Sequence, residues 1–193
     1  MKTMALILGL VLSVSSISFA DDIADFANKN CVKCHDESSG FPNLSAQTPD
    51  YLFRSLKDYQ GGLRHSDNAT TLMYKRVQAI DDLTLLGLAN YFNQQPAAAP
   101  TDGDPALIVT GKDIYENGVP AQAVVACIIC HGDKAEGLGT SPRLASQLHD
   151  FVVEQLQNYK NGLVDNQKRM STYSSQLSDE QMDAVATYLQ SLP

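Results

Sequence analysis

Two short segments decide how this 193-residue chain is organised: Cys31–His35 reads CVKCH, and Cys127–His131 reads CIICH. Together they contain all four cysteines of the chain and two of its four histidines. Cysteines in this pattern can form disulfides, bind zinc or attach a haem covalently. The two CxxC pairs of a zinc site usually lie about 15–20 residues apart, whereas here 92 residues, 35–126, lie between Cys34 and Cys127.

Covalent haem attachment uses the histidines as well as the cysteines. Two thiols separated by two residues on a helical turn reach the two vinyl groups of one haem, and the adjacent histidine is directed at the iron. Two copies at matching positions of the chain favour this interpretation over disulfides or zinc. We therefore predict two covalently attached haem c groups, held by Cys31, Cys34 and His35 and by Cys127, Cys130 and His131.

The chain also repeats itself around these motifs. Residues 41–63 and 141–163, compared at an offset of 100, are identical at eight of 23 positions. The final segments of the two halves match at an offset of 97, and the CxxCH motifs match at 96. Offsets that drift while the order of features holds are typical of a duplicated domain with loop insertions. We expect a signal peptide at 1–20, an N-terminal domain at 21–95, a Pro/Ala/Gly-rich linker at 96–105 and a C-terminal domain at 106–193.

Helical signals dominate each half, and no strand pattern is present. Thr48-Pro49 predicts a helix start, and the helix is expected to close at Gly61-Gly62. Ser178 followed by Gln181 predicts a capping box before the last helix, and the corresponding helix of the first half is expected to begin at Asp81. The predicted fold class is all-α.

The ligand on the far side of each iron follows from the register of the repeat. A methionine thioether there stabilises the reduced state and raises the potential. Met73 stands 38 residues after His35, and Met170 stands 39 residues after His131. Because Met73 and Met170 also match each other in the repeat, we predict that they are the second axial ligands.

Other residues near these positions have simpler interpretations. Met182 lies on the apolar face of the terminal helix and is expected to fill the core. His65 and His149 have no histidine at the matching position of the other half and are interpreted as surface residues. The carbonyls of Pro42 and Pro142 could accept the proton on the second ring nitrogen of each haem histidine, or these prolines could simply form turns.

The N-terminal segment indicates where the protein is located in the cell, and its net charge restricts the kinds of partner that it can bind. Lys2, an apolar run over 4–12 and small residues up to Ala20 are typical of a secretory signal peptide. That run is too short to span a bilayer core of about 30 Å. The formal net charge of −8 argues against nucleic-acid binding and allows at most a peripheral association with an anionic membrane. We expect an exported monomer whose partners are other redox proteins.

These features together resemble the dihaem cytochrome c4 family. In each half, CxxCH is followed by a Pro-x-Leu…Gln segment (Phe41–Gln47 and Ser141–Gln147), a methionine and a terminal helix. Gly111–Gly118 and Gly132 strengthen the resemblance. It implies two tandem class I cytochrome c domains related by a pseudo-twofold axis, in the bacterial periplasm. It also implies electron transfer with partners such as a terminal oxidase, a cytochrome bc complex or a dehydrogenase.

The first haem site departs from the family pattern, and other functions compete with a free carrier. Asp36 replaces the usual glycine, and seven residues lead from His35 to Pro42 where eleven lead from His131 to Pro142. We expect these departures to affect the exposure and potential of the first haem. The same chemistry would suit a cytochrome subunit of a periplasmic dehydrogenase. A dihaem enzyme, such as a peroxidase or a thiosulfate-oxidising cytochrome, would need an open iron position or a sulfur-reactive ligand.

Overall fold

The computed structural model describes residues 19–36, 39–64, 68–164 and 168–193. The predicted signal peptide, apart from its last two residues, and His65 lie outside this part of the chain. Within it all regular elements are helical, and only isolated bridges represent β structure, so the all-α prediction is confirmed. None of the helices in these ranges has the length and apolar character needed to cross a membrane.

The described part of the N-terminal half contains four helices around one small core. They are α1 Phe19–Asn30, α2 Pro49–Gln60, α3 Asn68–Val77 and α4 Asp82–Asn93. Helices α1 and α2 both pack against α4, and α3 packs against α2. The core residues of this half are Ile23, Ala27, Leu52, Leu88, Ala89 and Phe92.

The C-terminal half repeats this arrangement with one additional segment. Its elements are α5 Pro105–Asn117, a short 3₁₀ turn Pro120–Gln122, α6 Ile128–His131, α7 His149–Lys160, α8 Lys168–Ser174 and α9 Asp179–Gln190. Helix α1 runs directly into the first CxxCH motif, whereas residues 118–126 separate α5 from the second. The change of offset from 96 at the motifs to 100 at residues 41–63 arises after the motif instead, because eleven residues lead from His131 to Pro142 and only seven from His35 to Pro42.

Helices α5 and α9 cross at very short range in the second half. A Cβ atom added at Gly111 would overlap the Ala184 carbonyl and would lie 2.8 Å from Cβ of Tyr188. The Tyr115 and Tyr188 rings, one from each helix, pack with their centroids 5.6 Å apart. The glycine is therefore required by the packing of the two helix backbones.

The predicted helix starts are present, with one difference. The Ser178–Gln181 capping box forms in both directions, at 3.2 and 2.8 Å, and Asp81 accepts from Thr84 N–H at 3.0 Å. Thr48 occupies the N-cap position of α2, but its side chain makes no capping bond. Its hydroxyl instead donates to the Ser141 carbonyl of the other half at 3.4 Å, and Oε1 of Gln47 accepts the Thr48 N–H at 2.9 Å.

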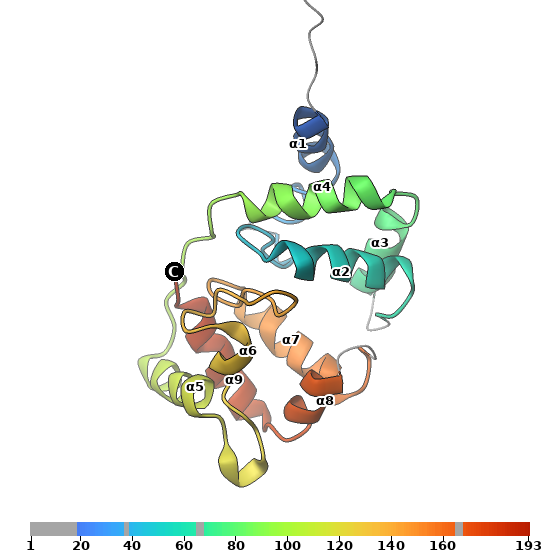
Figure 1. The fold of residues 1–193 in the computed structure, drawn as a ribbon. Coiled ribbons are helices and arrows are strands. Elements are labelled where there is room, and N and C mark those ends of the chain that lie inside the picture. Colours follow the sequence, from blue (N-terminus) through green and yellow to red (C-terminus); the bar gives the residue numbers. More distant parts are fainter. Residues whose placement is uncertain (1–18, 37–38, 65–67, 165–167) are drawn as a thin grey trace, which may run out of the picture.

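The two halves lie against each other with α2 and α7 at their junction, and residues 94–104 run along one side (Figure 1). The contacts between them are reciprocal. Gln47 bonds to both backbone groups of Arg143, donating to its carbonyl at 2.9 Å and accepting from its N–H at 2.6 Å. Gln147 bonds in the same way to Asn43, at 3.0 and 2.9 Å. Such an exchange of equivalent contacts is what a pseudo-twofold axis produces.

Candidate functional site

A cavity of about 1180 Å³ opens between the two halves and is lined by both. Its volume exceeds the range of about 300–1,000 Å³ of ordinary ligand pockets, as two large cofactors would require. All eight residues predicted to hold the cofactors line this cavity: Cys31, Cys34, His35, Met73, Cys127, Cys130, His131 and Met170.

Each CxxCH motif forms a tight turn at the cavity wall. Cys31 O accepts from the N–H groups of Cys34 and His35 at 3.0 and 3.1 Å. Cys127 O accepts from those of Cys130 and His131 at 3.1 and 3.0 Å. This hydrogen bonding holds both thiols and the imidazole on one turn of backbone, as attachment to a single haem requires.

The alternatives of disulfides and zinc find no support in this geometry. All four cysteines are unpaired. In the described ranges, no three histidine, cysteine or acidic side chains gather as a metal-binding group. Burial raises the pKa of the Cys31 and Cys127 thiols to about 11, with a further contribution from the neighbouring Cys34 or Cys130.

The backbone fixes the orientation of both histidines. Nδ1 of His35 lies 3.0 Å from the Pro42 carbonyl, and Nδ1 of His131 lies 3.0 Å from the Pro142 carbonyl. Because a carbonyl can only accept, Nδ1 carries the proton and Nε2 keeps its lone pair for a metal. Burial lowers the pKa of both imidazoles and outweighs the opposing effect of the carbonyl. The shorter loop after His35 leaves this contact unchanged in length.

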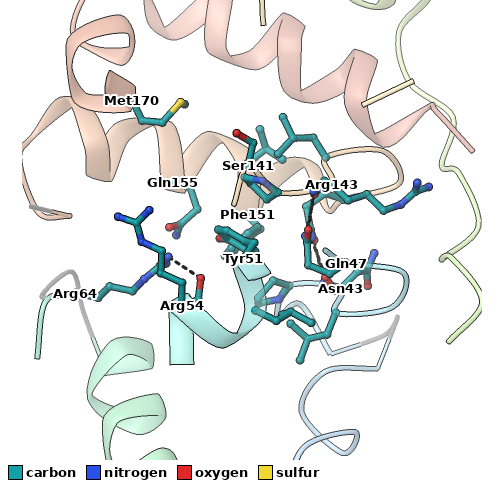
Figure 2. A pocket seen from close by; sticks show the side chains of 18 of the residues that line it. Asn43, Gln47, Tyr51, Arg54, Arg64, Ser141, Arg143, Phe151, Gln155 and Met170 are labelled. Atoms are coloured by element: carbon teal, nitrogen blue, oxygen red, sulfur yellow. Dashed lines mark hydrogen bonds between the residues drawn. The ribbon is translucent and has the colours of Figure 1, made fainter. Parts of the chain in front are cut away.

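The candidate methionines occupy equivalent positions in the two halves. Met73 on α3 and Met170 on α8 are half-buried and line the cavity, and Figure 2 shows Met170 above the cluster of lining side chains. Met182 is fully buried in the core of the second half and does not line the cavity. His149 is half-buried and hydrogen-bonded to Asp150 and Asp183, both at 2.8 Å, away from the cavity.

Arg64 belongs to the site, although sequence reasoning did not single it out. It is 5% exposed and lines the cavity (Figure 2). Its guanidinium donates to Ser55 Oγ at 3.1 Å and lies over the Tyr59 ring, 5.1 Å from the ring centroid. Its buried Nε has no hydrogen-bond partner, and no carboxylate of the described chain forms an ion pair with it.

A buried cation without a counter-charge is costly, and the carboxylates that every haem c carries would supply that charge. The orphaned Nε therefore fits a haem in this cavity. Arg64 pairs in an isolated antiparallel bridge with Val164, its counterpart in the repeat. The exchange of valine for arginine between the two copies was the signal in the sequence that could have identified this residue.

Comparisons with known proteins identify related cytochromes. Residues 108–193 match the family model for cytochrome c. A cytochrome c4 from Thiocapsa roseopersicina is 32% identical over 86% of this chain and 88% of its own length. A thiosulfate dehydrogenase electron acceptor from Thiomonas intermedia is 26% identical over 85% of this chain and 79% of its own length.

A solved structure shows the same architecture. That of the Acidithiobacillus ferrooxidans cytochrome c4 superimposes with a TM-score of 0.79 at 32% identity and covers 86% of this chain and 99% of that one. The match extends over both halves, and therefore over both attachment motifs. The chain belongs to the dihaem cytochrome c4 family, whose two tandem class I cytochrome c domains carry covalent haem c and transfer electrons.

Proposed function

We propose that this protein is a periplasmic electron carrier in which His35 and Met73 ligate one haem iron and His131 and Met170 ligate the other. The observation that carries the proposal is the duplicated geometry. In each half a histidine with Nδ1 fixed at 3.0 Å by a proline carbonyl lines the cavity, together with a methionine in the same register. When bound, haem supplies an iron that gains and loses one electron at a time.

The residues around the cavity determine how that electron is held. Each imidazole is kept in one tautomer and one orientation, so that its metal-binding nitrogen needs no rearrangement. Each thioether favours the reduced state and gives a high potential. An iron with two protein ligands also has no position left for peroxide or oxygen, which favours a carrier over an enzyme.

The partners that we propose are redox proteins of the cell envelope. The predicted signal peptide supports export, and the relative named as an electron acceptor of thiosulfate dehydrogenase supports a dehydrogenase as electron donor. A cytochrome bc complex is the alternative donor, and a terminal oxidase suits the role of acceptor. The two attachment motifs present different surfaces, since Lys33 is exposed in the first and Ile129 is 66% exposed in the second. The two haems would accordingly meet different partner surfaces.

A dedicated subunit of a dehydrogenase is the second candidate, and the same relative favours it. It shares the haem chemistry and differs in whether the partner stays bound. Purification of the native protein from its own organism, followed by size-exclusion chromatography, separates the two. A free carrier elutes at the mass of one chain, whereas a subunit elutes with a second polypeptide.

Replacement of the methionines tests the ligation. Met73→Ala or Met170→Ala should open one iron, so that the ferrous protein binds carbon monoxide there, while the other haem keeps its potential. Met182→Leu is the matched control: it conserves side-chain volume in the core, costs under about 1.5 kcal/mol and should leave both spectra unchanged. Rapid carbon monoxide binding by the unaltered protein would contradict the carrier function. A change at the second haem in Met182→Leu alone would show that Met170 is the wrong ligand.

A further inference from the structure

The two haem pockets differ one helical turn after the candidate methionine. Ser174 follows Met170 by four residues, and Val77 follows Met73 by four. Both are the last residues of their helices, α8 and α3, and both line the cavity. The turns that follow are the same, since the carbonyls of Val77 and Ser174 accept from Ile80 and Leu177 at 3.1 and 3.2 Å. The two positions are therefore structurally equivalent, and one is apolar where the other carries a hydroxyl.

The hydroxyl of Ser174 has no visible reason to be buried. The residue is 0% exposed, and its Oγ makes no hydrogen bond. A buried hydroxyl without a partner costs about 1–3 kcal/mol, and a valine at the same place in the other half shows that the fold does not need it. An acceptor present in the haem-loaded protein would remove this cost.

The helix geometry identifies the acceptor. Residues four apart lie on the same helix face, with Cβ atoms about 5–6 Å apart. Side chains also lean toward the helix N-terminus, so that of Ser174 leans toward Met170. A thioether sulfur is a weak hydrogen-bond acceptor.

We propose that Ser174 is a positioning residue that donates a hydrogen bond to the Met170 sulfur when that sulfur ligates the second haem iron. This inference rests on the proposed ligation by Met170. A hydrogen bond draws electron density from the sulfur and weakens its donation to the iron. The ferric state depends on that donation more than the ferrous state, so the bond raises the potential of the second haem. The first haem, with Val77 beside Met73, has no such contribution.

Two nearly isosteric substitutions test the proposal. Ser174→Val removes the hydroxyl, and Ser174→Thr keeps it while adding the same bulk. Potentials come from a spectroelectrochemical titration of the dihaem protein, and the NMR signals of the two ligand methyl groups are assigned with Met73→Ala and Met170→Ala. Ser174→Val should shift the reduction equilibrium of the second haem toward ferric by about threefold to tenfold, where tenfold is about 59 mV for one electron. It should also move the Met170 methyl signal, whereas Ser174→Thr should stay near the unaltered protein.

The reciprocal change provides a gain of function. Val77→Thr introduces a hydroxyl beside Met73 and should raise the potential of the first haem alone. Equal potentials in Ser174→Val and Ser174→Thr would overturn the proposal, because only packing would then matter. A lowered potential without movement of the Met170 signal would also overturn it, because the hydroxyl would then serve another acceptor, such as a haem carboxylate. If Met170→Ala fails to open the second iron, the proposed ligation fails instead.

Discussion

The reciprocal glutamines at the junction of the two halves make a quantitative prediction. Gln47 is 4% exposed, and its side chain makes three hydrogen bonds, to the N–H and C=O of Arg143 and to the N–H of Thr48. Gln147 is 6% exposed and makes the equivalent three, to Asn43 and Leu148. Each glutamine side chain thus satisfies two backbone groups of the other half and the N–H of the next residue, which is the N-cap of the following helix.

The cost of removing one glutamine follows from this count. Three bonds at about 0.5–1.5 kcal/mol each give about 1.5–4.5 kcal/mol for Gln47→Ala, and the same for Gln147→Ala. Water that enters the gap would move these values toward the lower limit. The double variant should lose about twice as much, because the two glutamines share no hydrogen-bond partner. We expect this loss to uncouple the two halves, so that they unfold separately.

Differential scanning calorimetry of the haem-loaded protein measures this effect. The unaltered protein should give one transition, and the double variant should give two. Gln78→Ala is the matched control, because the Gln78 side chain is exposed and, among the residues that the structure describes, bonds to Tyr74 alone, on the preceding turn. It should change stability by less than about 0.5 kcal/mol. Single variants that cost less than about 1 kcal/mol, with a double variant that still unfolds in one transition, would refute the reasoning.

Two further predictions concern the second half. Gly111→Ala should destabilise it by about 1–3 kcal/mol despite a gain in helix propensity, because the methyl group would overlap the Ala184 backbone. Thermal unfolding checks this against Gly61→Ala, where φ is −77° and the nearest atom, Lys57 O, is 3.4 Å away; equal melting temperatures would contradict the prediction. Partial burial lowers the pKa of His149, but hydrogen bonds that the ring donates to Asp150 and Asp183, together with their negative charges, more than offset this, so the folded-state pKa is raised. His149 should therefore add at most about 1 kcal/mol to the free energy of unfolding. This contribution should be complete below the pKa of the unfolded state, about 6.5, and should be lost as the pH rises through the pKa of the folded state. Urea unfolding between about pH 6 and pH 9 should show this loss in the unaltered protein and not in His149→Gln. The same pH dependence of stability in both proteins would contradict the prediction.

Local signals in the sequence were sufficient for much of the site. The CxxCH turn depends on residues within five positions of one another, and the capping box at Ser178 depends on residues within four. The carbonyls of Pro42 and Pro142 could be named as histidine partners because each lies a short loop away. The second methionine needed the repeat, since register distinguished Met170 from Met182. The ligation itself stays a prediction, as do the domain boundaries.

Contacts between the halves could not be derived in this way. The repeat shows that the halves are similar, but it does not say which faces meet. Gln47 and Gln147 were visible only as part of a family pattern, and their partners lie 96 and 104 residues away. The burial of Arg64 depends on the same junction and was missed for the same reason. Gly111 was noted as part of a motif, but its reason, the contact with α9, also requires the packed structure.

Duplication gives the two haems the same attachment, while the residues around the two attachment sites differ. Both motifs line one cavity, so electron exchange between the haems depends on how rigidly Gln47 and Gln147 hold the halves together. Exchange between two equal potentials has no preferred direction. A direction can then come from positions where the two copies diverge at the cavity, among them Arg64, whose counterpart in the repeat is Val164, and Ser174, whose counterpart is Val77. Arg64 lies at the junction and favours electrons on whichever haem it contacts, whereas Ser174 can act only on the second. Substitutions at these two positions should therefore shift the distribution of electrons without altering either attachment site.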